Sequence, residues 1–448
     1  MTPINSIHHV LGFIRDLSWA DVPDPVRHQA RRCLLDTLGV AAGGAQLPAA
    51  RILRDFAARH LGASDRGARL LMDGRRVSVP GACMAGAGGI DALDAHDGHV
   101  LCKGHVGVAV IPACLAFDEA YGAGGMEDLL TWLVLGYEIG TRAGIALHAS
   151  AAAYHTSGAW NALAVAAIGA RAVGLDAEAA RQALGIAEYY GPRSMMMRVI
   201  AHPTMLKDGS TMGGFAGASA ALLAAEGFTG APAETIEQFA ADPGLWRDLG
   251  ARWRIMEQYV KPMPVCRWAQ PAAQAVLALR AAHPHLDATQ VRGIEVRSFR
   301  EAVSLDCRDP EGTDAAQYSL PFAVAATLVH GRLTAAEIDG PALRDPAVLA
   351  LSRDARLIEA PSYSARFPAE RWADVTVTQA DGTVLESGPT TTVGDPERPL
   401  DDAALRAKFR AGSAGAWDAA TVAAIEAAVM GEGGTAALRQ RVLAGVSR

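Results

Sequence analysis

One short stretch of this chain holds an unusual density of side chains that can do chemistry. Residues 93–105 contain two aspartates, three histidines, a cysteine and a lysine, and an apolar run, residues 106–116, follows directly. Ionisable side chains resist burial unless they are paired or used, so this arrangement indicates a site whose pKa values are tuned by partial desolvation. Acid/base catalysis, metal binding and a solvated polar loop are the three interpretations that the stretch allows.

The metal interpretation rests on the types of donor present. Nitrogen, oxygen and sulfur donors that suit zinc or iron occur at Asp94, His96, Asp97, His99, Cys102 and His105. The chain has no HExxH and no CxxC, which are spacings specific for metal. We therefore expect no metal, and keep as an alternative a metal-dependent hydrolase built on His96, Asp97 and His99.

Composition excludes several classes of protein. The 448 residues are 50% hydrophobic, which is enough for two or three domains and a large core. A net charge of −7 leaves no basic stripe for nucleic acid and no polybasic membrane patch. The chain shows no secretory apolar run and no charge-free window of about 18 apolar residues, so we expect a cytoplasmic protein without membrane contact. Its six scattered cysteines predict free thiols.

Helical periodicity dominates the first half of the chain. It predicts helices at residues 25–40, 108–121, 126–147, 159–173, 177–188 and 212–226. The first of these opens with Asp24-Pro25, and proline suits the first turn of a helix. Runs of small residues at 159–170 and 215–225 lack a polar face, which predicts central helices buried on several sides. The pattern indicates an all-helical domain over residues 1–265.

The pattern changes after this point. Residues 291–299 and 372–380 alternate apolar and polar side chains, and Asp381-Gly382 is a strong hairpin signal before residues 383–385. Helical segments at 316–330 and 346–351 complete a predicted α+β domain over residues 266–395. The tail, residues 396–448, returns to helix and is expected to pack on the first domain. The fold class is therefore mainly α, with a large discontinuous all-helical domain and a smaller α+β domain.

A second polar group lies at residues 188–211. Arg193, Arg198 and Lys207 are suited to bind carboxylates, because a planar guanidinium meets a carboxylate with two hydrogen bonds and an ammonium supplies a compact charge. Residues 203–211 lead into the start of a predicted helix, a position that favours anions. A solvated charged loop is the alternative interpretation.

Six motifs together carry a resemblance to a known family. They are LLDTLG, LDAHDGH, HVG followed by PA, GYE, KPMPVCRW and AQYSLP, starting at residues 34, 93, 105, 136, 261 and 316. In this order they resemble the MmgE/PrpD family, which includes 2-methylcitrate dehydratase, cis-aconitate decarboxylase and iminodisuccinate epimerase. The resemblance implies a large helical domain, a smaller α+β domain, a homodimer, and an active site between the domains that uses no cofactor and no metal.

The resemblance also implies catalytic residues. Carried over by position, these are Asp94, His105, His155, Lys207 and Tyr318. Family members act on small di- and tricarboxylates by moving a proton at carbon, a task for which histidine is suited near neutral pH. The resemblance therefore predicts His105 and His155 as the acid/base pair, Lys207 as carboxylate ligand or proton donor, Asp94 as orienter of a histidine, and Tyr318 as auxiliary donor.

The chain departs from the family pattern at several positions. Many relatives read Asp-Phe-Asp-Asp-Thr-His in the first motif, whereas this chain has Ala95, His96 and Gly98, so a hydroxyl is absent and an imidazole is added. Gln270 stands where relatives often carry a histidine. These changes alter the expected pocket, in which we predict substrate binding by Lys103, His99, Arg193, Lys207, Ser210 and Gln270.

Two reactions fit this set of residues. We rank first a cofactor-independent lyase, of the hydratase/dehydratase or decarboxylase type, that acts on a small di- or tricarboxylate. A cofactor-independent epimerase or isomerase of an acidic substrate ranks second, since it needs proton removal and return but no acid for a leaving group.

Overall fold

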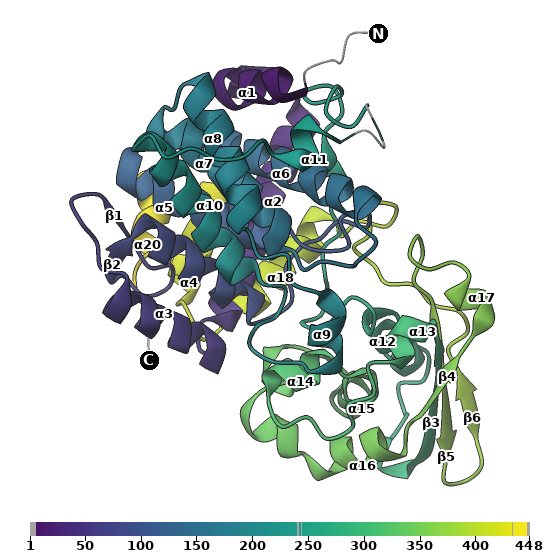
Figure 1. The fold of residues 1–448 in the computed structure, drawn as a ribbon. Helices are drawn as coiled ribbons and strands as arrows, with labels where there is room; N and C mark the ends of the chain where they lie inside the picture. Colours follow the sequence, from purple (N-terminus) through teal and green to yellow (C-terminus); the bar gives the residue numbers. More distant parts are fainter. Residues whose placement is uncertain (1–5, 240–241, 243, 432, 446–448) are drawn as a thin grey trace.

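The structure of the chain, a computed structural model, describes residues 6–239, 242, 244–431 and 433–445. It confirms a mainly α protein with a large helical part and a smaller α+β part (Figure 1). The predicted domain limits at residues 1 and 448 lie outside the described residues. Helices of the large part up to residue 239 are α1 (Ser6–Asp16), α2 (Asp24–Gly44), α3 (Pro48–His60), α4 (Val79–Asp91), α5 (Gly107–Tyr121), α6 (Met126–Ser150), α7 (Gly158–Val173), α8 (Ala177–Tyr190), α9 (Met196–Ala201), α10 (Ser210–Ala225) and α11 (Glu234–Glu237).

Small residues allow the central helices to approach closely. Helix α7 is buried from Gly158 to Ala170, as its lack of a polar face predicts. It packs against α10, where a Cβ atom at Gly213 would lie 2.6 Å from the carbonyl oxygen of Gly158. Glycine at this contact therefore sets the distance between two helices whose first turns adjoin the candidate site.

The C-terminal helices return to the large part. They are α18 (Asp402–Ser413), α19 (Ala419–Met430) and α20 (Thr435–Val442), and α18 and α19 pack against α2 (Figure 1). A Cβ atom at Gly39 of α2 would lie 3.0 Å from the Cα atom of Phe409, so the two helices also meet at a glycine. The helical part is therefore discontinuous in sequence, as the pattern predicts.

The smaller part contains a four-stranded sheet in the order β4-β3-β5-β6. Strand β3 (Val291–Ser298) pairs antiparallel with β5 (Ala373–Gln379) and parallel with β4 (Arg356–Glu359). The predicted hairpin is confirmed, because β5 pairs antiparallel with β6 (Val384–Glu386) across Gly382, whose φ is 86°. A second, two-stranded sheet, β1 (Gly67–Arg69) with β2 (Arg76–Ser78), lies in the large part.

The smaller part contains helices beyond the two predicted there, and one of the predicted helices is divided. They are α12 (Gln270–Ala282), α13 (Arg300–Val303), α14 (Thr313–Gln317), α15 (Leu320–His330), α16 (Pro346–Asp354) and α17 (Pro361–Ser364). A continuous helix over 316–330 is wrong, because Ser319 caps α15 by accepting a hydrogen bond from the Phe322 N–H at 3.0 Å, and Pro321 follows. This break places Tyr318 between two helices, where its side chain reaches the site.

Two further observations concern the whole described chain. All six cysteines carry free thiols, and five of them are buried. Within the described ranges, no helix combines the length and the apolar character that crossing a membrane requires.

Candidate active site

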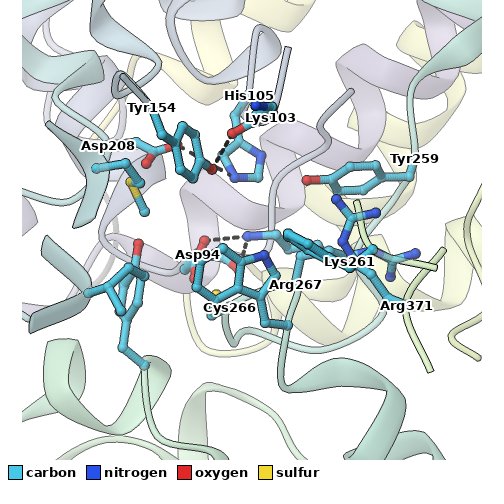
Figure 2. Close-up of a pocket in the computed structure, with 15 residues that line it drawn as sticks. Asp94, Lys103, His105, Tyr154, Asp208, Tyr259, Lys261, Cys266, Arg267 and Arg371 are labelled. Carbon is cyan, nitrogen blue, oxygen red and sulfur yellow. Dashed lines mark hydrogen bonds and ion pairs between the residues drawn. The ribbon is translucent and has the colours of Figure 1, made fainter. Parts of the chain in front are cut away.

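A cavity lies where the helical part meets the α+β part, and segments that are far apart in the sequence line it (Figure 2). The loop between α4 and α5 contributes Asp94, Lys103 and His105, and the loops before α7 and α10 contribute Tyr154 and Asp208. The connection between the two parts, residues 259–268, and the smaller part itself supply the remaining wall, which includes Tyr259, Lys261, Cys266, Arg267, Tyr318 and Arg371.

His105 is held in an orientation that leaves one ring nitrogen free to accept a proton. Its ring Nδ1 is hydrogen-bonded to the carbonyl oxygen of Asp97, and because a carbonyl only accepts, Nδ1 carries the proton and Nε2 has a free lone pair. The Nε2 atom lies 3.7 Å from the Asp208 carboxyl. Burial, reinforced by the charge of Lys261, lowers the pKa of His105 well below its usual range, so the imidazole stays neutral near pH 7.

Asp208 differs from His105, because its environment favours the protonated form of its side chain. Burial and the neighbouring carboxylate of Asp91 raise the pKa of Asp208 to about 7, although Ser157 Oγ donates a hydrogen bond to it at 2.6 Å. Asp91 is buried as well, and burial and the carboxylate of Asp94 raise the pKa of Asp91 to about 7. The site therefore holds a neutral base, His105, beside a carboxyl group that keeps its proton up to about neutral pH.

A buried ion pair forms the centre of the cavity. The ammonium of Lys261 binds the Asp94 carboxylate and also donates to the Asp94 carbonyl at 3.1 Å (Figure 2). Burial alone would lower the pKa of Lys261, but the Asp94 carboxylate outweighs it and raises the pKa, so the ammonium stays charged. Asp94 adopts a φ of 52°, a left-handed conformation that aspartate tolerates better than most residues.

Two tyrosines and a cysteine of the wall are neutral. Burial raises the pKa of the Tyr259 hydroxyl to about 12 and that of Tyr318 well above its usual range. Burial likewise raises the pKa of the Cys266 thiol to about 12, so this cysteine is not a nucleophile at neutral pH. The two tyrosines are therefore hydrogen-bond donors that do not add negative charge to the cavity.

Gly98, one of the departures from the family pattern, has a steric reason in this fold. A Cβ atom at this position would collide with the hydroxyl of Tyr259 and lie 2.7 Å from His105 Nδ1. The main chain of Gly98 also pairs with Tyr259, donating at 3.0 Å and accepting at 2.7 Å. Glycine therefore lets Tyr259 approach the ring of His105, where a larger residue would push the tyrosine away.

Four of the sequence-predicted site residues line the cavity, namely Asp94, Lys103, His105 and Tyr318. Lys207 lies outside the lining and is 2% exposed. Its ammonium is 2.9 Å from Asp314, bonds the side-chain oxygen of Gln317, and sits 5.5 Å from the centre of the Tyr318 ring. Lys207 therefore contacts the site through Tyr318, from behind the cavity wall.

The remaining predicted residues lie elsewhere. His155 is half-buried, and its Nδ1 lies 3.2 Å from the carbonyl oxygen of Arg193, whose own side chain is 42% exposed. Ser210 accepts a hydrogen bond from Asn161 at 3.2 Å. Gln270 donates to the main-chain carbonyls of residues 263 and 265, at 2.7 and 3.0 Å, so it shapes the connection between the two parts.

The residues of the metal alternative do not converge. His96 Nε2 is 3.2 Å from Asp91, and His99 Nε2 is 3.0 Å from Glu257. Asp97 accepts from the Tyr137 hydroxyl and from the main-chain N–H of Gly107 at 3.3 Å. In the part of the chain that the structure describes, no three His, Cys, Asp or Glu side chains are grouped so as to hold a metal ion. The geometry thus gives the hydrolase alternative no support.

Sequence reasoning missed several residues of the wall. Lys261 could have been found from the sequence. It is a lysine within the otherwise uncharged run Tyr-Val-Lys-Pro-Met-Pro-Val-Cys, which predicts a buried charge that needs a partner. The sequence signal for Asp208 is weaker: it is a carboxylate next to Lys207 in a predicted turn before a helix. The sequence holds no signal for Arg371, since this residue lies in a polar loop 104 residues beyond Arg267, its neighbour in the fold.

Comparison with known families agrees with this architecture. The model of the MmgE/PrpD N-terminal domain matches residues 9–241, and that of the MmgE/PrpD C-terminal domain matches residues 263–431. The chain therefore belongs to the MmgE/PrpD family, whose members are in general enzymes of dehydratase type. A search of the curated proteins found no match.

Proposed function

We propose that this protein is a cofactor-independent lyase that moves a proton at a carbon next to a carboxylate of a small di- or tricarboxylate. The observation that carries the proposal is the state of His105, whose Nδ1 is committed to the Asp97 carbonyl and whose Nε2 lies 3.7 Å from Asp208. A neutral imidazole and a carboxyl group that holds its proton near pH 7 are an acid/base pair suited to this chemistry.

The surrounding groups support the same reaction. Removal of a proton next to a carboxylate spreads negative charge onto the carboxylate oxygens, and the Lys261 ammonium is placed in the cavity to stabilise that charge. The neutral hydroxyls of Tyr259 and Tyr318 are further donors. Asp208 supplies the proton for a leaving group, and Lys207 supports Tyr318 from outside the cavity. His155, predicted as the second member of the pair, receives no part in this scheme.

An epimerase or isomerase of an acidic substrate is the alternative, because His105 and Asp208 also suffice to remove and return a proton. Proton NMR in D₂O separates the two. The purified protein is incubated, without added metal, with citrate-like, aconitate-like and amino-dicarboxylate compounds. A new alkene, hydration of an alkene or release of CO₂ establishes the lyase, whereas deuterium entering an α-carbon without net product favours the epimerase. No exchange with any of these compounds contradicts both.

The pH dependence of turnover tests the role of Asp208. Because burial and Asp91 raise the pKa of Asp208 to about 7, the acid form is present below this value and is lost above it. We expect kcat/KM to fall as pH rises through about 7, while His105, whose pKa is lowered, stays neutral well into the acidic range. Asp208→Asn is expected to remove this alkaline decline, and Asp91→Asn to move its midpoint to lower pH. A decline that persists unchanged in Asp208→Asn contradicts the assignment.

We also propose that the protein is a homodimer. An exposed apolar surface surrounds a groove of about 760 Å³ at the start of α10, and includes Ile52, Met195, Met205, Leu206 and Met212. Leu206 is 74% exposed and adds to this patch, and contiguous exposed apolar patches are typical of protein–protein interfaces.

The oligomeric state can be measured directly. Sedimentation at micromolar concentration is expected to give twice the chain mass of 46.7 kDa. Leu206→Glu is expected to shift the protein to monomer with unchanged far-UV circular dichroism, because a charge on this surface opposes its burial. A monomeric wild-type protein contradicts the proposal.

A further inference from the structure

Two arginines in the cavity wall have no role in the proton transfer described above. Arg267 follows Cys266 in the connection between the two parts, and its side chain is almost fully buried, with 5% exposure. One terminal nitrogen, Nη2, binds the carboxylate of Asp395. The other nitrogens, Nε and Nη1, are buried and find no hydrogen-bond partner among the described residues. Buried N–H groups without partners are costly, so their presence in a cavity indicates a ligand.

Arg371 completes the pair from the other part of the molecule. It lies in the loop before β5, and its guanidinium is 5.7 Å from the centre of the Phe367 ring. Its Nε is buried without a partner, and no carboxylate within the described ranges lies within ion-pair distance of it. Burial first, and also the charge of Arg371, lower the pKa of Arg267, which shows that the two cations oppose each other. One carboxylate, Asp395, therefore balances two guanidinium groups.

The position of the pair relates it to the reacting groups. Arg267 lies 4.8 Å from the centre of the Tyr259 ring, and both arginines line the same cavity as His105 and Lys261. Figure 2 shows them together on the Tyr259 side of Lys261, with Asp208 on the opposite side. A molecule bound between these groups would place one end at the arginines and the other at the acid/base pair.

We propose that Arg267 and Arg371 form a subsite for a second carboxylate of the substrate, at the end remote from the carbon that exchanges its proton. The proposal rests on the proposed function and assigns the residues that bind the second acid group of the substrate. A guanidinium donates charge-assisted hydrogen bonds to a carboxylate, and Nε and Nη1 of Arg267 and Nε of Arg371 are buried donors without a partner among the described residues. The pair together with Asp395 has one net positive charge, which matches a carboxylate better than a phosphate dianion.

Binding of succinate and of its monoamide, succinamate, tests the subsite without any turnover. We expect isothermal titration calorimetry to show that Arg371→Gln weakens succinate binding about tenfold or more, because a charge-assisted pair of hydrogen bonds is lost. Binding of succinamate is expected to change little, since its amide offers no charge to the arginine. Arg371→Lys, which keeps the charge but not the planar pair of donors, is expected to lie between wild type and Arg371→Gln.

Arg366→Gln is the matched control. Arg366 lies in the same loop, is exposed, and pairs with Glu370 instead of facing the cavity. Equal losses for both ligands in Arg371→Gln, or an equal loss in Arg366→Gln, would overturn the proposal, as would failure of succinate to bind the wild type at millimolar concentration. If Arg371→Gln unfolds, the proposal is tested with Arg371→Lys by the same comparison of succinate and succinamate binding. Selective succinate binding without proton exchange in D₂O would uphold the subsite and contradict the proposed reaction, so the two failures are distinguishable.

Discussion

Replacing His105 by glutamine is expected to lower turnover by about 100-fold or more, with the fold preserved. Glutamine can donate to the Asp97 carbonyl that now accepts from Nδ1, but it has no lone-pair nitrogen to take a proton in place of Nε2. Steady-state kinetics on the substrate found by NMR measures the effect, and thermal unfolding checks the fold. Because an interaction made only in the transition state is removed, kcat and kcat/KM should fall together.

Two companion variants sharpen this result. His285→Gln changes an exposed histidine of the smaller part and controls for the substitution itself. His155→Gln distinguishes the prediction from the family pattern from the prediction from the structure. The family pattern predicts a loss of turnover as large as that in His105→Gln. The position of His155 outside the cavity lining predicts a smaller loss of turnover. Near-normal turnover in His105→Gln would remove this histidine from the mechanism.

Replacing Lys261 by methionine is expected to destabilise the protein by about 3–5 kcal/mol. Both members of the pair are buried, with Lys261 at 0% and Asp94 at 3% exposure, so removing the cation leaves a carboxylate without its counter-charge in the interior. Urea-induced unfolding of the variant and the wild type measures the difference in the free energy of unfolding.

The double variant Asp94→Asn/Lys261→Met provides the control for this prediction. With both charges absent, most of the stability is expected to return, because the cost comes from the unpaired charge more than from the loss of the pair. Activity is not expected to return, since Lys261 also lies in the cavity beside the acid/base pair. A Lys261→Met variant as stable as the wild type would mean that water or another cation compensates Asp94, and would contradict the buried ion pair.

Much of the fold could be predicted because local patterns specify it. The helical repeats that became α5, α6, α7 and α8 are long and strongly apolar, and the alternation of residues 372–380 before Asp381-Gly382 defines a strand and its turn without tertiary contacts. The short strand β4 was not predicted, because its pairing with β3 is parallel and depends on a distant segment. Tyr318 was placed inside a helix that Ser319 and Pro321 interrupt.

The candidate site was likewise predicted from the sequence in part, and the rest of it depends on the tertiary structure. The sequence alone predicted a site near residues 94–105, because charged side chains next to a buried run must be paired or used. Only the tertiary structure decided which of the other groups join them, since Asp208, Lys261 and Arg371 come from segments separated by tens of residues and meet at the junction of the two parts. The protonation states that distinguish His105 from Asp208 were likewise decided by burial and by neighbouring charges, which arise only when the chain is folded.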